Sequence, residues 1–505
     1  KGNIQATLSQ SQRFIQTYPE TSILHNVIGA CFSHTGQFEK ALFHFKESLK
    51  LNPSDPIAYN NLGNVLIDLK LFDESQKLFE HAIKINPNFA EAYNNLGNAL
   101  KEQEIYEKAI PYYKKAIELQ ASYFEAYNNL GIALYKLKNY TEAEEKLKQA
   151  VKLNPEFAEA YSTLGSILKD RKKIPEAIQH FDKAVKINPQ YAEAYNNKGS
   201  CLREKGLLGE AIIAFEKAIS LKKNYTDALF NKGVTLLEKG DVDNAIENFK
   251  QVNNIIPTFI DSHYSMGNAQ MQKGKLEDAI ESYKKVIIID PEYTGAYYNI
   301  GMALMEMGRL EAAIKTYNQV IKLEPNYEGI YNAMGLAFYK KEDSNAAIKN
   351  FKKAIKINPN SLEAYNNLGI IFFKHKGELA LAMEAYKEAI KISPETDSVW
   401  HNIFFPMQCL KICNPKLFDN HLKELKDLAT ETAQIQIKAL NYKLNRGSSK
   451  VVAGFEETLY QMAKDRRHKI KNPNPTPKEG LKERSLSQKI FALIHAGRSG
   501  TTLLH

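Results

Sequence analysis

The sequence predicts an all-α solenoid, in which pairs of helices stack one after another. The first observation is a glycine that recurs eleven times at intervals of 34 residues, and a fixed period of this size is typical of repeat architectures. The second is a constant pattern of residue types around that glycine. The third is a composition of 44% hydrophobic and 25% charged residues, ordinary for a folded chain. The repeat glycines are Gly29, Gly63, Gly97, Gly131, Gly165, Gly199, Gly233, Gly267, Gly301, Gly335 and Gly369.

Three further residue types keep a constant distance from the repeat glycine. An alanine twelve residues after it, with the glycine itself, lets two helices cross closely. An aromatic residue four before it fills the gap to the next repeat, with His25, Leu229 and His263 as exceptions. A proline 24 residues after it ends the second helix, because proline has no N–H to donate. The aromatics are Tyr59, Tyr93, Tyr127, Tyr161, Tyr195, Tyr297, Tyr331 and Tyr365; the alanines are Ala41, Ala109, Ala143, Ala177, Ala211, Ala245, Ala279, Ala313 and Ala347; the prolines are Pro53, Pro87, Pro155, Pro189, Pro257, Pro291, Pro325 and Pro359.

This pattern resembles the tetratricopeptide-repeat (TPR) family over residues 22–396. The resemblance implies a right-handed TPR superhelix, an α-α solenoid of eleven full repeats in one continuous array whose first helices line an inner groove. The last copy carries one inserted residue, so its alanine is Ala382 and its proline is Pro394. We expect residues 1–21 to be a partial repeat, namely the second helix of an interrupted copy with Pro19 after it.

A row of asparagines is predicted to lie along the inner groove, two residues before the repeat glycine. The string AYNNLGNAL of residues 92–100 is similar to the repeats of O-GlcNAc transferases, where an asparagine ladder grips the backbone of extended peptides. An amide offers a donor and an acceptor to a peptide bond, so these residues are candidate contacts for a protein or peptide partner. The alternative is that they are simply solvated. The row consists of Asn61, Asn95, Asn129, Asn197, Asn231, Asn299 and Asn367.

The inner groove becomes more apolar toward its C-terminal half. Three residues before the glycine, Asn60, Asn94 and Asn128 give way to Phe230, Tyr264 and Tyr298. One residue after the glycine, asparagine gives way to Val234, Met302, Leu336 and Ile370. The three aromatic residues are predicted to form an apolar recognition patch for a partner. The alternative is that these side chains pack on each other between repeats.

A cap and a linker are expected after the repeats. Residues 397–468 are predicted to be a helical cap over the last apolar face, with Trp400 in the place of a repeat aromatic. Residues 469–488 are predicted to be a Pro/Lys-rich linker, in which Pro473, Pro475 and Pro477 alternate with polar residues. Nine basic and three acidic residues between Lys464 and Lys489 carry +6 of the chain's +9. The remainder is nearly balanced, which argues against a nucleic-acid partner.

The last residues have the pattern of a phosphate site. The apolar run 490–494 is typical of a buried strand, and a loop of small residues and an incipient helix follow it. A helix N-terminus offers free N–H groups and a positive dipole end to an anion. The string GRSGTTLL of residues 497–504 lacks the Gly-Lys-Ser/Thr of a Walker A loop. It resembles instead the 5′-phosphosulfate loop of sulfotransferases, particularly the RSGTTL form of tyrosylprotein sulfotransferases and of bacterial TPR–sulfotransferase fusions.

The sulfotransferase resemblance covers about residues 490–505 and implies a set of site residues. Arg498, Ser499, Gly500, Thr501 and Thr502 would bind the 5′-phosphate of the cosubstrate 3′-phosphoadenosine 5′-phosphosulfate (PAPS), and Arg498 would also be catalytic. We expect residues 489–505 to be the first strand, loop and helix of a truncated α/β P-loop-like sulfotransferase domain. The family's 3′-phosphate ligands and catalytic base would lie beyond it, so this fragment alone is expected to be inactive.

The sequence therefore favours the N-terminal part of a TPR-fused sulfotransferase that transfers a sulfuryl group to a hydroxyl acceptor. The first alternative is a non-enzymatic TPR scaffold for protein–protein interaction. The second is a glycosyltransferase of the O-GlcNAc type, against which the GRSGTTLL loop argues. No metal is expected, because no His–Cys grouping has convincing zinc spacing. No membrane span is expected, because no uncharged apolar run is long enough to cross a bilayer. Four cysteines are too few for a disulfide framework, and we expect a cytoplasmic location.

Overall fold

The computed structural model describes residues 4–327, 329–428, 437, 440 and 444, with the exception of the side chains of Ile412 and Cys413. Within these residues the chain is helical throughout and contains no strand, which confirms the predicted all-α solenoid. Judged by length and apolarity, none of the described helices could cross a lipid bilayer. The expected linker 469–488 and the loop from Arg498 to Thr502 lie outside the described residues.

Eleven helix pairs follow a first single helix, α1 (Ile4–Thr17). The first helices of the pairs are α2 (Ser22–His34), α4 (Pro56–Asp68), α6 (Ala90–Glu102), α8 (Phe124–Lys136), α10 (Ala158–Asp170), α12 (Ala192–Glu204), α14 (Thr226–Glu238), α16 (Ile260–Gln272), α18 (Thr294–Glu306), α20 (Ile330–Lys340) and α22 (Leu362–Ile371). The second helices are α3 (Phe38–Leu51), α5 (Phe72–Ile85), α7 (Tyr106–Leu119), α9 (Tyr140–Leu153), α11 (Ile174–Ile187), α13 (Leu208–Leu221), α15 (Val242–Ile255), α17 (Leu276–Ile289), α19 (Leu310–Leu323), α21 (Ser344–Ile357) and α23 (Leu379–Ile392).

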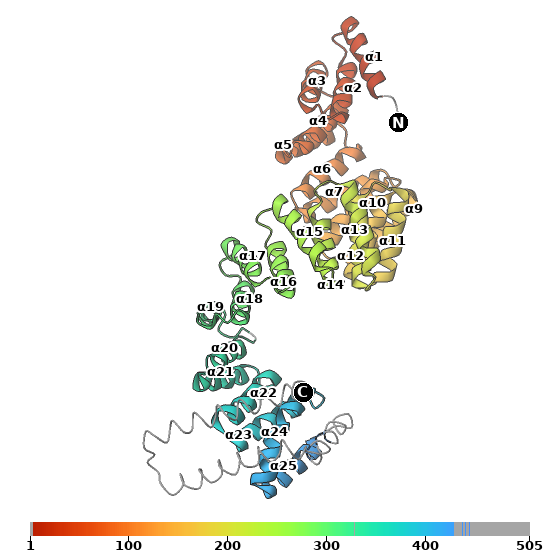
Figure 1. The fold of residues 1–505 in the computed structure, drawn as a ribbon. Coiled ribbons are helices and arrows are strands. Elements are labelled where there is room, and N and C mark those ends of the chain that lie inside the picture. The colour runs from red at the N-terminus through yellow and green to blue at the C-terminus, as the bar shows by residue number, and fades with distance from the viewer. Residues whose placement is uncertain (1–3, 328, 429–436, 438–439, 441–443, 445–505) are drawn as a thin grey trace. The chain divides into compact units, whose positions relative to one another are not determined.

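The chain divides into two compact units, Lys1–Pro257 and Thr258–His505. The first unit holds α1 to α15, and the second holds the helices from α16 onward (Figure 1). The expectation of one continuous array over residues 22–396 stays a prediction. Each repeat of a solenoid contacts only its neighbours, so each unit is described by itself.

Within each unit every helix packs on the next one along the chain. A first helix packs on the second helix of its own repeat, and that second helix packs on the first helix of the following repeat. The apolar face of a single pair is thus buried only by stacking. The alanines twelve residues after the repeat glycine are fully buried at these crossings; Ala41, Ala143 and Ala279, for instance, have no exposed surface.

The repeat glycine faces an aromatic ring of the second helix. A Cβ atom added to any of the eleven glycines would lie only 2.3–2.8 Å from a side chain sixteen or seventeen residues later. That side chain is aromatic in every repeat except the fourth, where it is Leu147. The predicted close helix crossing is therefore present, and a buried ring is what passes over the glycine. The rings belong to Phe45, Phe79, Tyr113, Phe181, Phe215, Phe249, Tyr283, Tyr317, Phe351 and Tyr386.

A residue with left-handed backbone conformation joins the two helices of every repeat. Seven residues after the repeat glycine the backbone has a positive φ, as helix C-termini commonly require. Glycine fills this position in five repeats, and in the last repeat it lies one residue later. Lys70, Glu104, Lys138, Lys172 and Glu342 fill it in the others with φ between 59° and 65°. An L-residue is strained there by roughly 1–2 kcal/mol, so the turn is imposed by the packing of the two helices.

The inserted residue of the last repeat is accommodated by a π-helical turn. The turn η1 (Phe372–Lys376) continues directly from α22, and the left-handed glycine of this repeat is Gly377, eight residues after Gly369 instead of seven. Single-residue insertions into helices characteristically produce such turns. The register is restored in α23, where Ala382 and Tyr386 are again fully buried.

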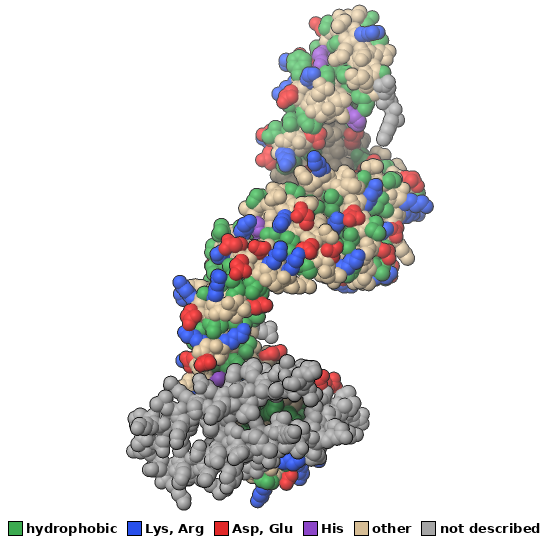
Figure 2. Space-filling view, in the orientation of Figure 1, with side chains coloured by type: hydrophobic (Ala, Val, Ile, Leu, Met, Phe, Trp, Pro, Cys, Tyr) green, Lys and Arg blue, Asp and Glu red, His purple; other side chains and the backbone are tan. Residues whose placement is uncertain are grey.

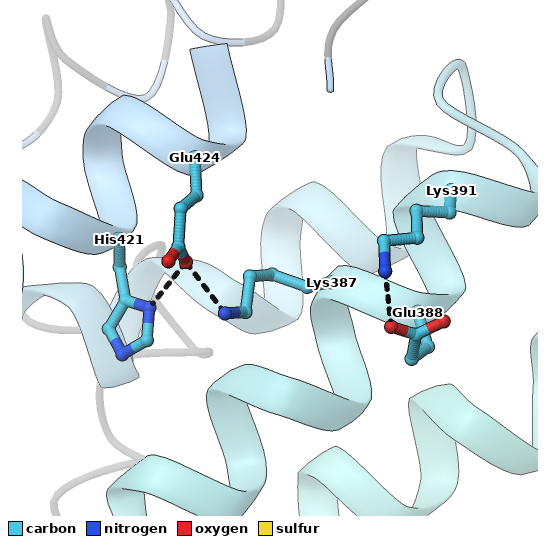
Figure 3. A network of polar contacts seen from close by, with 5 residues as sticks. All are labelled: Lys387, Glu388, Lys391, His421 and Glu424. Atoms are coloured by element: carbon cyan, nitrogen blue, oxygen red, sulfur yellow. Dashed lines mark hydrogen bonds and ion pairs between the residues drawn. The ribbon is translucent and has the colours of Figure 1, made fainter. Parts of the chain in front are cut away.

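Two further helices, α24 (Asp397–Cys413) and α25 (Pro415–Leu428), pack after the last repeat. Their apolar side chains share one core with α21 and α23, and Trp400 lies in that core with 4% of its surface exposed. The indole Nε1–H donates to the carbonyl oxygen of Pro394 at 2.7 Å. At the edge of this core, Lys387 of α23 contacts the Glu424 carboxylate of α25 at 2.6 Å, and His421 contacts the same oxygen at 3.2 Å (Figure 3).

Candidate functional site

The predicted asparagine row forms hydrogen bonds between repeats. In six of its seven members the Nδ2 atom donates to the residue 35 positions earlier, which lies three residues before the preceding repeat glycine. Examples are Asn95 to Asn60 at 2.9 Å and Asn231 to Asn196 at 3.1 Å. Asn299 donates to the Tyr264 hydroxyl at 3.0 Å. We call this set of bonds the amide ladder, and it fixes the orientation of each donating side chain.

The amide ladder is interrupted where the next repeat lacks the asparagine. After Asn128 the corresponding donor position holds Thr163, whose hydroxyl donates to the backbone carbonyl of Glu159 instead. Asn128 is 2% exposed, and its Oδ1 atom has no hydrogen-bond partner. A buried unsatisfied oxygen of this kind costs about 1–3 kcal/mol, so this junction is a weak point of the first unit.

Thr163→Asn is expected to restore the ladder bond to Asn128 and to raise the free energy of unfolding of the first unit by about 1 kcal/mol. Threonine and asparagine have similar helix propensities, so the bond is the main difference. Urea denaturation followed by circular dichroism measures the effect. Thr163→Val keeps the size but supplies no donor and should give no gain. An equal gain from both variants would contradict the assignment.

Asn197 is the exception among the seven predicted asparagines. The residue 35 positions earlier is Ser162, in place of the asparagine or tyrosine that accepts in the ladder. Asn197 has no hydrogen-bond partner in the described part of the chain and is not among the buried unsatisfied groups. Its donor and acceptor atoms therefore face solvent, whereas the other six amides are committed to the ladder through Nδ2.

Asn197 lines a cavity of about 540 Å³ in the first unit. The cavity is built by α10, α12 and α14, which are all first helices of their repeats. It brings together three of the predicted partner-binding residues, Asn197, Phe230 and Asn231. Asn196 and Ser200 complete its polar centre. Asn61, Asn95 and Asn129 lie in earlier repeats of the same unit and are not part of the cavity.

Charged side chains of both signs border this cavity. Lys169, Arg203, Glu204, Asp227 and Glu238 all line it. Arg203 and Glu238 are 4.0 Å apart, and Glu204 accepts from Lys172 at 3.0 Å. Lys169 and Asp227 form no ion pair within the described residues, so each presents an uncompensated charge. Over α11–α15, lysine and arginine side chains are interspersed with acidic ones on the visible face (Figure 2).

The predicted aromatic patch is divided between the two units. Phe230 belongs to the first unit and lies 5.9 Å from the ring of Phe249. Tyr264 and Tyr298 belong to the second unit and contact other tyrosines there. The second unit also holds Asn299 and Asn367, whose amides donate within the ladder.

The cysteines of the described residues are buried thiols. Cys31, Cys201 and Cys409 all have at most 8% of their surface exposed. Burial raises the pKa of Cys201 to about 11, so its thiol is protonated and unreactive near neutral pH. The side chain of Cys413, which would pair with Cys409 in a metal or redox site, lies outside the described part of the chain.

The pairing of two positions across neighbouring repeats is the part of the site that sequence reasoning missed. The asparagines two before the glycine were predicted, but their acceptors are the residues three before the preceding glycine. The sequence does not show this pairing plainly. Phe230 and Tyr298 are followed, 35 residues later, by Ser265 and Ala333, but Tyr264 is followed by Asn299 and Asn128 by Thr163.

Comparison with repeat-family models matches most of the chain. Models described as TPR repeat match residues 34–70, 267–308, 301–342 and 335–376. Models described as tetratricopeptide repeat match residues 55–122, 88–156, 128–192, 164–227, 226–259 and 362–396. Together they span 34–259 and 267–396. No curated protein sequence matches the chain.

Several solved structures are similar to parts of the chain. The structure of YrrB, described as a TPR protein with an unusual peptide-binding site, is 26% identical, with 37% of this chain and 95% of that chain covered and a TM-score of 0.30. MamA is 28% identical, with coverages of 34% and 92% and a TM-score of 0.32. Yeast Tom70 is 14% identical, with coverages of 81% and 100% and a TM-score of 0.38. On the family matches and the repeating helix pairs, the chain belongs to the tetratricopeptide-repeat proteins.

Proposed function

We propose that this chain is a TPR scaffold that binds an extended peptide segment of a partner protein in the cavity formed by α10, α12 and α14. The observation that carries the proposal is the uncommitted amide of Asn197. It can donate to a carbonyl oxygen and accept from an N–H group of the same peptide backbone. The neighbouring ladder bond of Asn231 to Asn196 at 3.1 Å holds the next amide in a fixed orientation, which reduces the ordering cost of binding.

The charges bordering the cavity support a peptide carrying both signs. Lys169 and Asp227 line the cavity and have no ion-pair partner in the described structure. A ligand that pairs with them loses no protein–protein contact. Such rim charges contribute more to specificity and association rate than to affinity. The backbone contacts of Asn197 would therefore supply affinity, and the charges would select the side chains of the segment.

The substitution Asn197→Ala is expected to weaken peptide binding without changing the stability of the protein. A panel of synthetic peptides is screened against the immobilised chain, and the affinity of the tightest binder is measured by fluorescence anisotropy. Asn197→Ala should weaken that peptide at least about tenfold, equivalent to about 1.4 kcal/mol, because both backbone contacts are lost. Its melting temperature should stay unchanged, because Asn197 has no intramolecular partner to lose.

Asn129→Ala is the matched control for this experiment. Asn129 donates to Asn94 at 3.0 Å and lies outside the cavity. Its removal should lower the melting temperature and leave the peptide affinity unaltered. Lys169→Gln and Asp227→Asn should change which peptides of the panel bind, without affecting stability. Equal affinity of wild type and Asn197→Ala would refute the cavity as the binding site.

A second candidate function rests on the GRSGTTLL string of residues 497–504 and the apolar run before it. We propose that, in the full-length protein, Arg498 to Thr502 bind the 5′-phosphate of PAPS, so that the repeats present an acceptor to a sulfotransferase domain. Charge-assisted hydrogen bonds to a phosphate dianion are worth about 1.5–3 kcal/mol each. The support is the sequence pattern alone, since these residues lie outside the described part of the chain.

Calorimetry of the full-length protein with 3′-phosphoadenosine 5′-phosphate, the desulfated product, tests the second candidate. Arg498→Ala should weaken nucleotide binding by at least about tenfold, or about 1.4 kcal/mol. Ser485→Ala, in the expected linker, should leave it unchanged. If the nucleotide does not bind, or binds Arg498→Ala as well as wild type, the scaffold function stands without an enzymatic one.

A further inference from the structure

Four half-buried tyrosines of the second unit form two ring pairs. Tyr264 lies 5.2 Å from Tyr293, and Tyr298 lies 5.3 Å from Tyr327, measured between ring centroids. In each pair one tyrosine stands three residues before a repeat glycine, and the other eight residues before the next. We call these four residues the tyrosine surface. Burial raises the pKa of Tyr327, and the nearby Tyr264 and Tyr298 raise it further.

Buried rings of the second helices hold two tyrosines of the tyrosine surface in place. Tyr264 packs at 5.7 Å on Tyr283, and Tyr298 packs at 6.1 Å on Tyr317. Tyr283 and Tyr317 are the rings under the repeat glycines and are at most 1% exposed. The Tyr264 hydroxyl is held by Asn299 at 3.0 Å. Ring positions are thus set before a ligand arrives, so little side-chain freedom is lost on binding.

In the first unit, the position three before the repeat glycine pairs with a different residue of the next repeat. There Asn60 donates to Glu91 at 3.0 Å, and Glu91 stands six residues before the next glycine. In the second unit the position of Glu91 is taken by Gly295 and by Gly329. A Cβ atom on Gly295 would lie 3.2 Å from the Tyr264 hydroxyl oxygen, and one on Gly329 would lie 3.6 Å from that of Tyr298. Two consecutive repeats therefore replace an asparagine–glutamate pair by tyrosine and glycine.

Uncompensated carboxylates border the tyrosine surface. Burial raises the pKa of Tyr293, and the nearby Tyr264, Asp261 and Asp290 raise it further. Glu324 likewise raises the pKa of Tyr327. None of these three acids has an ion-pair partner among the described residues. An aromatic face with acids around it suits a cationic ligand, because aromatic faces attract cations as well.

The chain itself contains a segment of matching chemistry, residues 469–478 with the sequence KIKNPNPTPK. Its alternating prolines favour polyproline II, the conformation that aromatic-lined grooves bind at low entropic cost. Three lysines, Lys469, Lys471 and Lys478, flank the prolines, and the segment has no acidic residue. It follows Leu444, the last described residue, by 25 positions. That length spans at most roughly 85 Å.

We infer that the tyrosine surface binds residues 469–478 of the same chain, with prolines against the rings and lysines toward Asp261, Asp290 and Glu324. Because the tether makes this contact intramolecular, the segment has a high effective concentration at the surface. It therefore competes with any external basic, proline-containing segment. This inference is independent of the peptide cavity in the first unit.

Photo-crosslinking in the full chain tests the contact. Thr476 is replaced by p-benzoylphenylalanine, and the crosslinked peptides are identified by mass spectrometry. Crosslinks to residues 258–330 of the same chain are expected, in a yield independent of protein concentration. Crosslinks elsewhere, or none, would overturn the inference. A yield that rises with protein concentration would show that a second copy is the occupant, which also overturns it.

Charge variants test the recognition chemistry. Lys469→Glu, Lys471→Glu and Lys478→Glu together should reduce the crosslink yield at least about fivefold, and 0.5 M salt should weaken the contact as well. Lys482→Glu with Arg484→Glu, outside the segment, is the matched control and should leave the yield unchanged. On the surface, Asp261→Asn with Glu324→Gln removes exposed charges without touching the core and should reduce the yield likewise.

A peptide added in trans checks occupancy of the surface. A synthetic peptide with the sequence of residues 469–478 should bind the triple Lys→Glu chain, whose surface is vacated, at least about tenfold more tightly than wild type. Equal binding to both chains would show that the surface is open in the wild type and would contradict intramolecular occupancy.

Discussion

Trp400→Ala is expected to lower the free energy of opening of the C-terminal helices by about 3–5 kcal/mol, the usual cost of deleting a large buried aromatic side chain. Trp400 has 4% of its surface exposed and shares a core with residues of α21 and α23. Its indole N–H also satisfies the Pro394 carbonyl at 2.7 Å. In a solenoid the terminal helices have a neighbour on one side only, so the loss should open α24 and α25 first.

Amide hydrogen exchange measures this effect helix by helix. Faster exchange is expected in α22 to α25, with no change in α2 to α15 of the first unit. Trp400→Phe keeps most of the apolar contact and loses only the donated hydrogen bond, so it should cost about 1–2 kcal/mol. His401→Ala, at an exposed neighbouring position, should have no effect. Unchanged exchange in Trp400→Ala would mean that this core does not hold the cap in place.

Gly301→Ala is expected to destabilise the second unit by about 1–3 kcal/mol, despite the higher helix propensity of alanine. The added Cβ would lie 2.3 Å from Cε1 of Tyr317, the shortest such distance at any of the eleven repeat glycines. Tyr317 has no exposed surface. Its ring therefore cannot swing into solvent, and relief requires the two helices α18 and α19 to separate.

Gly209→Ala is the matched control, because it is the same substitution in a helix with no atom within 4 Å of the new Cβ. There the propensity gain should prevail and raise stability by up to about 1 kcal/mol. Chemical denaturation of both variants, read by circular dichroism, decides the comparison. A Gly301→Ala protein as stable as the wild type would mean that the helix crossing relaxes freely, contrary to the packing argument.

These two predictions differ in how far the sequence alone supports them. The 34-residue interval of the glycines indicated the helix pairs and a close crossing at Gly301. It did not say which side chain passes over that glycine, although the aromatic residue sixteen positions later recurs in nearly every copy. The left-handed turn was equally readable from the glycines seven positions later. It was obscured by Lys70, Glu104, Lys138, Lys172 and Glu342, whose residue types do not indicate a positive φ.

The sequence by itself determined the helix pairs, their number and the row of asparagines on the first helices. These features follow from periodicity, because a residue that recurs at the repeat period occupies the equivalent position in each helix pair. The one-residue insertion of the last repeat was also readable, whereas its accommodation as the π-helical turn η1 was not. Composition further marked residues 469–488 as a Pro/Lys-rich linker.

Only the tertiary structure decided what each asparagine does. The acceptor of a ladder amide lies 35 residues away in the sequence, in the neighbouring repeat, and is reached only through the stacking of helices. Asn231 is consequently committed to Asn196, whereas the position that would accept from Asn197 holds Ser162, and Asn197 remains available in the cavity. The division at Pro257 was likewise invisible to a repeat pattern that runs through it unchanged. Hydrogen-bond partnership and unit boundaries depend on contacts between repeats, and a pattern that is the same in every repeat carries no information about where those contacts differ.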